Sequence, residues 1–150
     1  MSFNASLAVL DAIRRVVDEH GLAAVYDGIA GGRGPVGYTI GLSKDGLPEV
    51  VIFGLAPGLT EPLLMNAAAL VREHQGVPPD DALASLVTGT RLCAVTVEDS
   101  STDLPLANRF FQIADPVPAV QLVYTDVHGL FPWERGSMLA NLPVLGDPLA

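Results

Sequence analysis

The sequence predicts an α+β domain with a mainly antiparallel sheet, and three observations support this fold class. The chain has 150 residues, a usual length for one domain. Apolar residues make up 49% of it and charged residues 17%, a composition that can bury a core. Three strand patterns follow one another without a helix between them, which favours an antiparallel arrangement. We expect the helices on one side of this sheet, which could form a half-open barrel.

The first third of the chain predicts one helix and three strands. Apolar residues recur at helical spacing up to Val17, and His20 and Gly21 mark the last turn and the left-handed end of this helix. Strands are then expected at residues 23–27, 36–42 and 49–55. The third strand is an almost continuous apolar run, which is typical of a strand buried on both faces.

The rest of the chain predicts three helices, two strands and a tail. Thr60 is expected to cap a long helix that starts with Glu61 and Pro62. The other elements are a short helix from 80 or 81 to near 89, a strand at 91–97, a short helix at 103–111 and a strand at 119–125. Residues 136–150 are expected to be an extended tail on the surface, and residues 1–150 a single globular domain.

Charge and cysteine content exclude several classes of partner. The net charge is −9 and the few Lys and Arg residues are scattered, which argues against a nucleic acid and against an anionic membrane surface. Cys93 is the only cysteine, so no internal disulfide can form and a cytoplasmic location is expected. The N-terminal segment has the pattern of neither a signal peptide nor a membrane span.

Three sequence blocks occur together in an order known from one family. They are HG at 20–21, YTIGL at 38–42 followed by PEVVIFGL at 48–55, and PVPAVQLVYTDVHGLFPWE at 116–134. On these blocks the chain resembles the uncharacterised bacterial family called domain of unknown function 4262. Members often carry His before the Pro-Glu pair and Trp after the HG pair, where this chain has Leu47 and Leu22. The resemblance implies a related fold and no particular reaction.

Several motifs carry little chemical signal. The stretch GGRGP at 31–35 could wrap a phosphate with its backbone amides, but it lacks the features of a P-loop and is expected to be a hairpin loop. Cys93 lies in an apolar strand and is expected to be inert. No G-x-S-x-G motif is present, which argues against an α/β-hydrolase.

The histidines do not have the spacing of metal ligands, so no metal site is expected. His20 and His74 fall in the last turns of predicted helices, where a cation interacts favourably with the helix dipole. His128 lies in a turn beside the FPW sequence and is the best candidate for an exposed titrating group. Whether the three histidines converge in space is open.

Polar residues within apolar strands mark the candidate site. Tyr38 and Thr39 should point to opposite faces of the sheet, so one of them faces the interior. A buried Tyr hydroxyl needs a partner, and Glu49, Asn66 or Gln121 could supply it. Such buried polar groups indicate either a structural hydrogen-bond network or a ligand pocket.

An aromatic corner completes the candidate site. Phe131 and Trp133 could cover one end of the core or wall a pocket whose polar members are Tyr38 and Gln121. The candidate ligand-binding residues are Thr39, Asn66, Gln121, Phe131 and Trp133, and the candidate catalytic residues are Tyr38, Glu49 and His128.

Two classes of function follow from these residues. The first is a binding or accessory domain for a small molecule or a protein partner, with a homodimer as an open alternative. The second is an enzyme that uses Tyr38, Glu49 or His128 for cofactor-free acid-base chemistry or cyclisation in an apolar pocket. A flavin-binding split barrel is a further alternative, because VVIFGLAPG followed by TEP loosely resembles the flavin phosphate site of that fold. No cofactor is otherwise expected.

Overall fold

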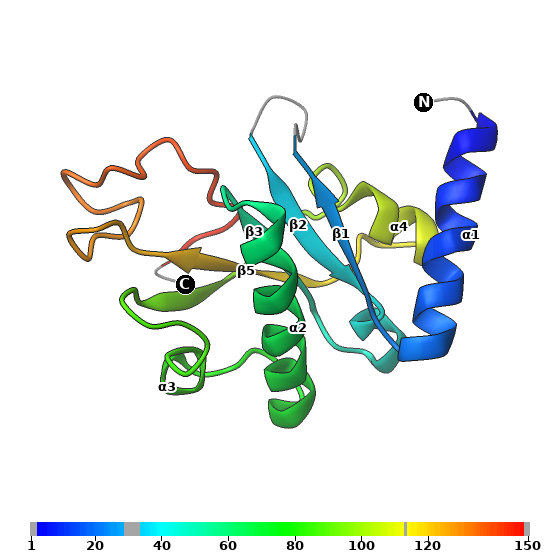
Figure 1. Cartoon of the computed structure of the whole chain (residues 1–150), viewed down its shortest axis with the longest axis horizontal. Helices are drawn as coiled ribbons and strands as arrows, with labels where there is room; N and C mark the ends of the chain where they lie inside the picture. Colours follow the sequence, from blue (N-terminus) through cyan, green and yellow to red (C-terminus); the bar gives the residue numbers. More distant parts are fainter. Residues whose placement is uncertain (1–2, 29–33, 113, 149–150) are drawn as a thin grey trace.

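The computed structural model describes residues 3–28, 34–112 and 114–148 (Figure 1). Its elements are α1 (Phe3–His20), β1 (Ala23–Asp27), β2 (Val36–Ile40), the 3-10 helix η2 (Leu42–Asp45), β3 (Glu49–Phe53), α2 (Pro57–His74), α3 (Asp80–Leu83), β4 (Leu92–Thr96), α4 (Pro105–Phe111) and β5 (Ala119–Tyr124). Residues 31–33 of the GGRGP stretch lie outside the described residues, so the expected hairpin loop is not tested there.

The strands form one open, mixed sheet in the order β1-β2-β3-β5-β4. The pairs β1–β2, β2–β3 and β4–β5 are antiparallel, whereas β3 and β5 are parallel. This confirms the predicted α+β fold with a mainly antiparallel sheet. The parallel pair arises because α2, α3, β4 and α4 separate β3 from β5 in the chain, which gives the chain room to return to the same end of the sheet.

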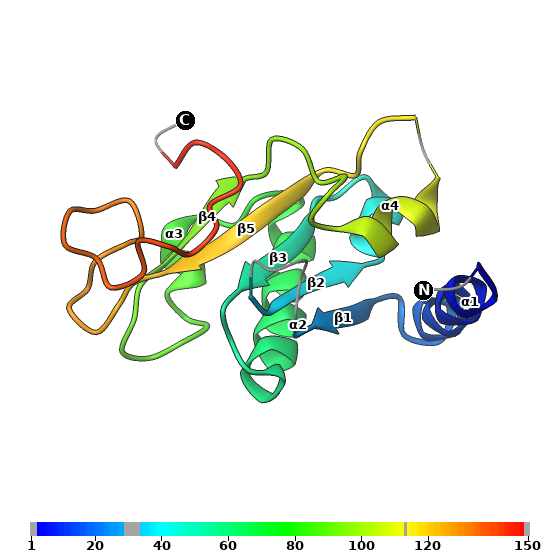
Figure 2. The same cartoon turned by 90° about the horizontal axis from the view of Figure 1, so that it is seen from above.

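Helices cover both faces of the sheet, so the expectation of helices on one side was wrong. In β3, Val50 and Ile52 pack into a cluster with residues of α2, whereas Val51 and Phe53 pack into a second cluster with residues of α1 and α4. In both views β1 and β2 lie between α2 and the pair α1–α4 (Figures 1 and 2). The apolar run of β3 is buried on both faces, as its sequence predicts, and each face needs its own cover.

The helix α2 lies very close to β2 because of a glycine. A Cβ atom on Gly37 would overlap the Cγ2 atom of Thr60 on α2. Thr60 lies inside this helix, so the expectation from the sequence that Thr60 caps the helix was wrong. The helix begins at Pro57, whose fixed φ angle suits the first helical turn, and the Thr60 hydroxyl donates a hydrogen bond of 2.8 Å to the carbonyl of Ala56.

Other helix ends differ from expectation by a few residues. The helix α3 ends at Leu83 and not near Gly89, because the chain continues in turns. The helix α4 starts at Pro105 after the N-cap residue Leu104, so Asp103 lies outside it. The expected ends at His20 and His74 are confirmed, and Gly21 has the left-handed φ angle of 78°.

The last described residues, 136–148, contain no helix or strand, and the part from Leu142 to Leu145 packs on the sheet. Leu142 and Leu145 pack on the cluster beneath α1 and α4. The amide of Glu98 donates a hydrogen bond of 3.0 Å to the carbonyl of Leu145. This tail therefore covers the part of the sheet that α1 and α4 leave open. Across residues 3–28, 34–112 and 114–148, none of the helices is both long and apolar enough to cross a membrane.

Candidate functional site

Glu49 is fully buried at the start of β3, and its carboxylate accepts four hydrogen bonds from its own chain. Thr39 donates through its hydroxyl at 2.8 Å. The backbone amides of Gly41, Leu42 and Ser43 donate at 3.2, 3.2 and 2.9 Å. The carboxylate thus holds the turn between β2 and β3 closed.

The electrostatics of Glu49 reflect two opposing effects. Burial raises the pKa of this carboxyl group, and the hydrogen bonds from Ser43, Thr39 and Gly41 lower it in part. The Thr39 hydroxyl also accepts a hydrogen bond of 2.9 Å from the amide of Val50. Both candidate residues therefore make well-formed contacts within the turn, and neither lines a cavity described below.

Tyr38 and Gln121 lie on the sheet face that α1, α4 and the tail cover. The Tyr38 hydroxyl accepts a hydrogen bond of 3.2 Å from the amide of Leu106 in the first turn of α4, and burial raises its pKa to about 12. The Gln121 side chain donates to the carbonyl of Pro143 at 2.7 Å and accepts from the amide of Leu145 at 2.8 Å. Tyr38 thus anchors α4, and Gln121 anchors the tail.

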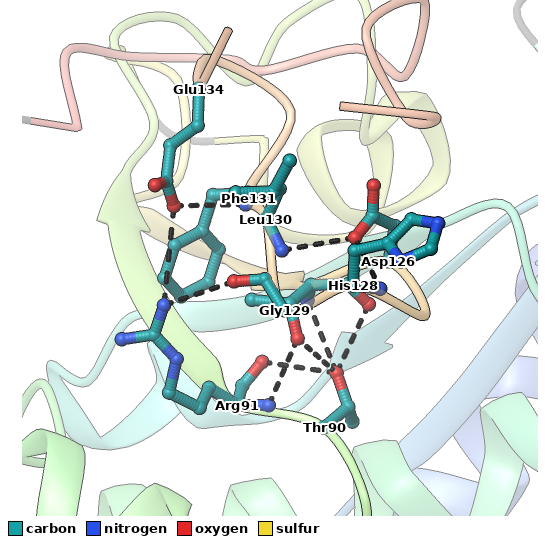
Figure 3. Close-up of polar contacts among 9 residues, drawn as sticks. Thr90, Arg91, Asp126, His128, Gly129, Leu130, Phe131 and Glu134 are labelled. Carbon is teal, nitrogen blue, oxygen red and sulfur yellow. Dashed lines mark hydrogen bonds and ion pairs between the residues drawn. The ribbon is translucent and has the colours of Figure 1, made fainter. Parts of the chain in front are cut away.

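Residues 126–134, here called the FPW loop, are organised by one aspartate (Figure 3). The Asp126 carboxylate accepts hydrogen bonds from the amides of His128 at 2.9 Å, Leu130 at 3.0 Å and Met138 at 2.8 Å. These hydrogen bonds hold the pKa of Asp126 below its usual value, and the bond from the Met138 amide has the largest effect. The loop is therefore a defined structure that one carboxylate closes.

The aromatic corner is a stack of three side chains. The rings of Phe131 and Trp133 lie 4.9 Å apart and almost parallel, and the Arg91 guanidinium lies 4.9 Å from the centre of the Phe131 ring. The Arg91 guanidinium also donates a hydrogen bond of 3.1 Å to the carbonyl of Gly129. A carboxylate oxygen of Glu134 lies 4.0 Å from the same guanidinium (Figure 3). Trp133 remains 37% exposed at the outer end of the stack.

The histidines do not meet at a common site. His20 and His74 are exposed at the ends of α1 and α2, and His128 is exposed on the FPW loop. Within the part of the chain that the structure describes, no group of three or more His, Cys, Asp and Glu residues could hold a metal ion.

A cavity of about 350 Å³ lies between α2, the segment 86–92 and β5, and we call it the α2 cavity. Its walls are Leu55, Gly58, Leu59, Pro62, Leu63, Asn66, Leu86, Val87, Thr88, Thr90, Leu92 and Tyr124. Asn66 is the candidate ligand-binding residue that lies here. Most other wall residues were missed because their apolar side chains look like core residues in the sequence. Leu59, in contrast, is 64% exposed in the structure.

Thr90 connects the α2 cavity to the FPW loop. Its hydroxyl oxygen lies 2.8 Å from that of Thr125 and accepts a hydrogen bond of 3.2 Å from the Thr125 amide. Thr125 directly precedes the FPW loop, and Arg91, the residue after Thr90, supports Phe131 (Figure 3). One wall of the cavity and the base of the aromatic stack are therefore parts of the same short segment.

The structure does not bring Tyr38, Glu49, Gln121 and the aromatic corner into one cavity. Glu49 pairs with Ala119 at the start of β5, whereas the FPW loop follows the end of β5. Tyr38 and Gln121 are separated by Val51 of β3, which puts them about 10 Å apart at the usual strand spacing. Both lie on the face opposite to the α2 cavity.

The fold and the cavity define a class of small α+β domain in which helices cover both faces of an open mixed sheet. The family model described as "Domain of unknown function (DUF4262)" matches residues 16–138, and the chain belongs to this family. The resemblance seen in the three sequence blocks is thereby confirmed. No curated protein and no solved structure matches the chain. Leu22, which follows the HG pair, and Leu47, which precedes the Pro-Glu pair, are both buried in the core.

Proposed function

We propose that this domain binds a small, largely apolar molecule in the α2 cavity. The observation that carries this proposal is the cavity itself. Its volume of about 350 Å³ falls within the range of ligand pockets, and apolar walls with a few polar groups are typical of such sites.

The exposed apolar side chains at the cavity support binding over a purely structural role. Leu59 is 64% exposed on the first turns of α2, and Leu55 and Leu86 on facing segments are only partly buried. Covering apolar surface stabilises a complex by roughly 25 cal/mol per Å² before the costs of association. A ligand that fills the cavity would therefore gain affinity from side chains that water now contacts.

The enzyme hypotheses have less support from the geometry. Glu49 and Tyr38 are hydrogen-bonded to the backbone of their own chain and lie away from the α2 cavity. No specific observation favours the flavin alternative, because the residues that the first turns of α2 contribute to the cavity are apolar. A protein partner, a homodimer and a cytoplasmic location stay predictions from the sequence.

Ligand-observed NMR with a panel of neutral aromatic fragments tests this proposal. In the variant Asn66→Trp the indole should fill the cavity from its α2 wall, and binding should fall at least about tenfold. Ala69→Trp is the matched control, since Ala69 is exposed on the same helix and does not line the cavity. Fragments that bind Asn66→Trp as tightly as the unchanged protein, or that bind neither protein, would overturn the proposal.

A further inference from the structure

We infer that the α2 cavity selects an uncharged ligand with an apolar body and one carboxamide-like group. This inference rests on the proposed function and specifies the ligand class of the same site.

The absence of charge from the cavity walls carries the first step. Every wall residue lies in the described part of the chain, and none of them has an ionisable acidic or basic side chain near neutral pH. A charged group that enters such a cavity loses part of its hydration and finds no counter-charge in the walls. The net charge of −9 adds a further penalty for an anion.

The neighbouring charged residues point to other surfaces. Arg91 follows the wall residue Thr90, but its guanidinium lies over Phe131 and donates to the carbonyl of Gly129. Glu61 lies on α2 next to the wall residue Pro62, but it lines a separate groove beside α1. Neither residue therefore supplies a counter-charge within the cavity.

The polar wall groups differ in whether their hydrogen-bonding capacity is already used. The Tyr124 hydroxyl donates to the carbonyl of Phe53 at 3.0 Å, and the Thr90 hydroxyl is bonded to Thr125. Asn66 and Thr88, in contrast, have no side-chain hydrogen bond within the described structure. These two are the groups that a ligand can use.

The chemistry of Asn66 then defines the polar part of the ligand. Its side-chain amide offers both N–H donors and a carbonyl acceptor. A carboxamide or a lactam presents the complementary donor and acceptor side by side and remains uncharged. Thr88, whose hydroxyl can donate or accept, also lines the cavity.

Three probes with the same ring system test the inference: 2-naphthamide, 2-naphthoate and 2-naphthylmethylammonium. We expect 2-naphthamide to bind at least about tenfold more tightly than either ion at pH 7.5, in NMR titrations that follow the Asn66 side-chain amide. Equal or tighter binding of the naphthoate or the ammonium ion would overturn the uncharged-ligand inference and leave the binding proposal intact. If none of the three probes binds, both proposals fail.

Variants of Asn66 test its role separately. Asn66→Leu should retain binding of naphthalene and remove the advantage of 2-naphthamide over naphthalene. Asn66→Asp should favour the ammonium probe over 2-naphthamide, because it places the missing counter-charge in the wall. An unchanged order of affinities in both variants would show that Asn66 does not select the ligand.

Discussion

Three buried polar residues lie on the apolar strands of the sheet, and each holds a different segment in place: Glu49, Tyr38 and Gln121. Glu49 binds the turn that follows β2, Tyr38 binds the start of α4, and Gln121 binds the tail. A buried polar group is costly unless it is hydrogen-bonded, so each of these side chains specifies one position of its partner segment. The alternative of a structural network, which the sequence left open, accounts for the contacts of all three residues.

Replacing Glu49 should destabilise the fold even when the shape of the side chain is kept. In Glu49→Gln, one carboxylate oxygen becomes an NH₂ group that faces backbone amide donors. We expect the free energy of unfolding to fall by about 2–4 kcal/mol, measured by urea denaturation. Glu73→Gln, an exposed site on α2, is the control and should change stability by less than about 0.5 kcal/mol. A similarly small effect in Glu49→Gln would contradict the anchoring role.

Cys93 should react slowly in the folded protein. It is half-buried on β4, and burial together with the charge of Asp80 raises its pKa to about 11. The thiolate is the reactive form, so little of it is present at pH 7.5. We expect labelling with a thiol reagent to be at least about tenfold slower than in the same protein unfolded in guanidinium. Equal rates before and after unfolding would show that the thiol is accessible and ionised.

At the scale of elements, the contact between α2 and β2 depends on Gly37. In Gly37→Ala the added methyl group would meet the Cγ2 atom of Thr60, and the helix would have to move away from the sheet. We expect a loss of about 1–3 kcal/mol in unfolding experiments. Thr60→Ser removes that methyl group and keeps the hydroxyl that bonds Ala56, so the double variant should recover at least half of the loss. If the double variant recovers none of the lost stability, the added methyl group of Gly37→Ala is not strained against Thr60.

The FPW loop should loosen in acid. The pKa of Asp126 is lowered in the folded protein, so its ionised carboxylate stabilises the folded loop. This stabilisation is complete above the usual Asp pKa of 3.8 and is lost as the pH falls through the lowered folded-state pKa. Trp133, the only tryptophan, should report this as greater quenching of its fluorescence by acrylamide below about pH 4.

A variant separates this effect from general acid unfolding. Asp126→Asn can keep the bonds from the His128 and Leu130 amides, but its NH₂ group would face the Met138 amide. We expect this variant to show the greater quenching of Trp133 already at pH 7. Far-UV circular dichroism that stays constant over the same range would confine the change to the loop. Unchanged quenching in Asp126→Asn would contradict the role of this carboxylate.

At the scale of the whole molecule, local patterns predicted the elements better than their arrangement. The apolar run from Val50 to Phe53 predicted a strand buried on both faces, and the structure confirms this prediction. The pattern at residues 119–125 predicted a strand, which the structure has at Ala119–Tyr124. The parallel pairing of β3 with β5 and the placing of helices on both faces depend on packing between distant segments, which local periodicity does not encode. The α2 cavity was missed for the same reason, since Leu86 and Val87 look like ordinary core residues until the fold leaves them facing a space.

The tail has no helix or strand of its own, and Gln121 attaches it to the sheet through two side-chain hydrogen bonds. In Gln121→Met the two bonds to Pro143 and Leu145 are removed at similar side-chain volume. We expect a loss of about 1–2 kcal/mol in stability and faster hydrogen exchange of the Leu145 amide, because this amide then exchanges whenever the tail opens. Amides of β2 should keep their protection, since α4 covers that strand through the separate contact of Tyr38. Equal acceleration in β2 and in the tail would mean that the tail does not open independently and that Gln121 supports the whole sheet.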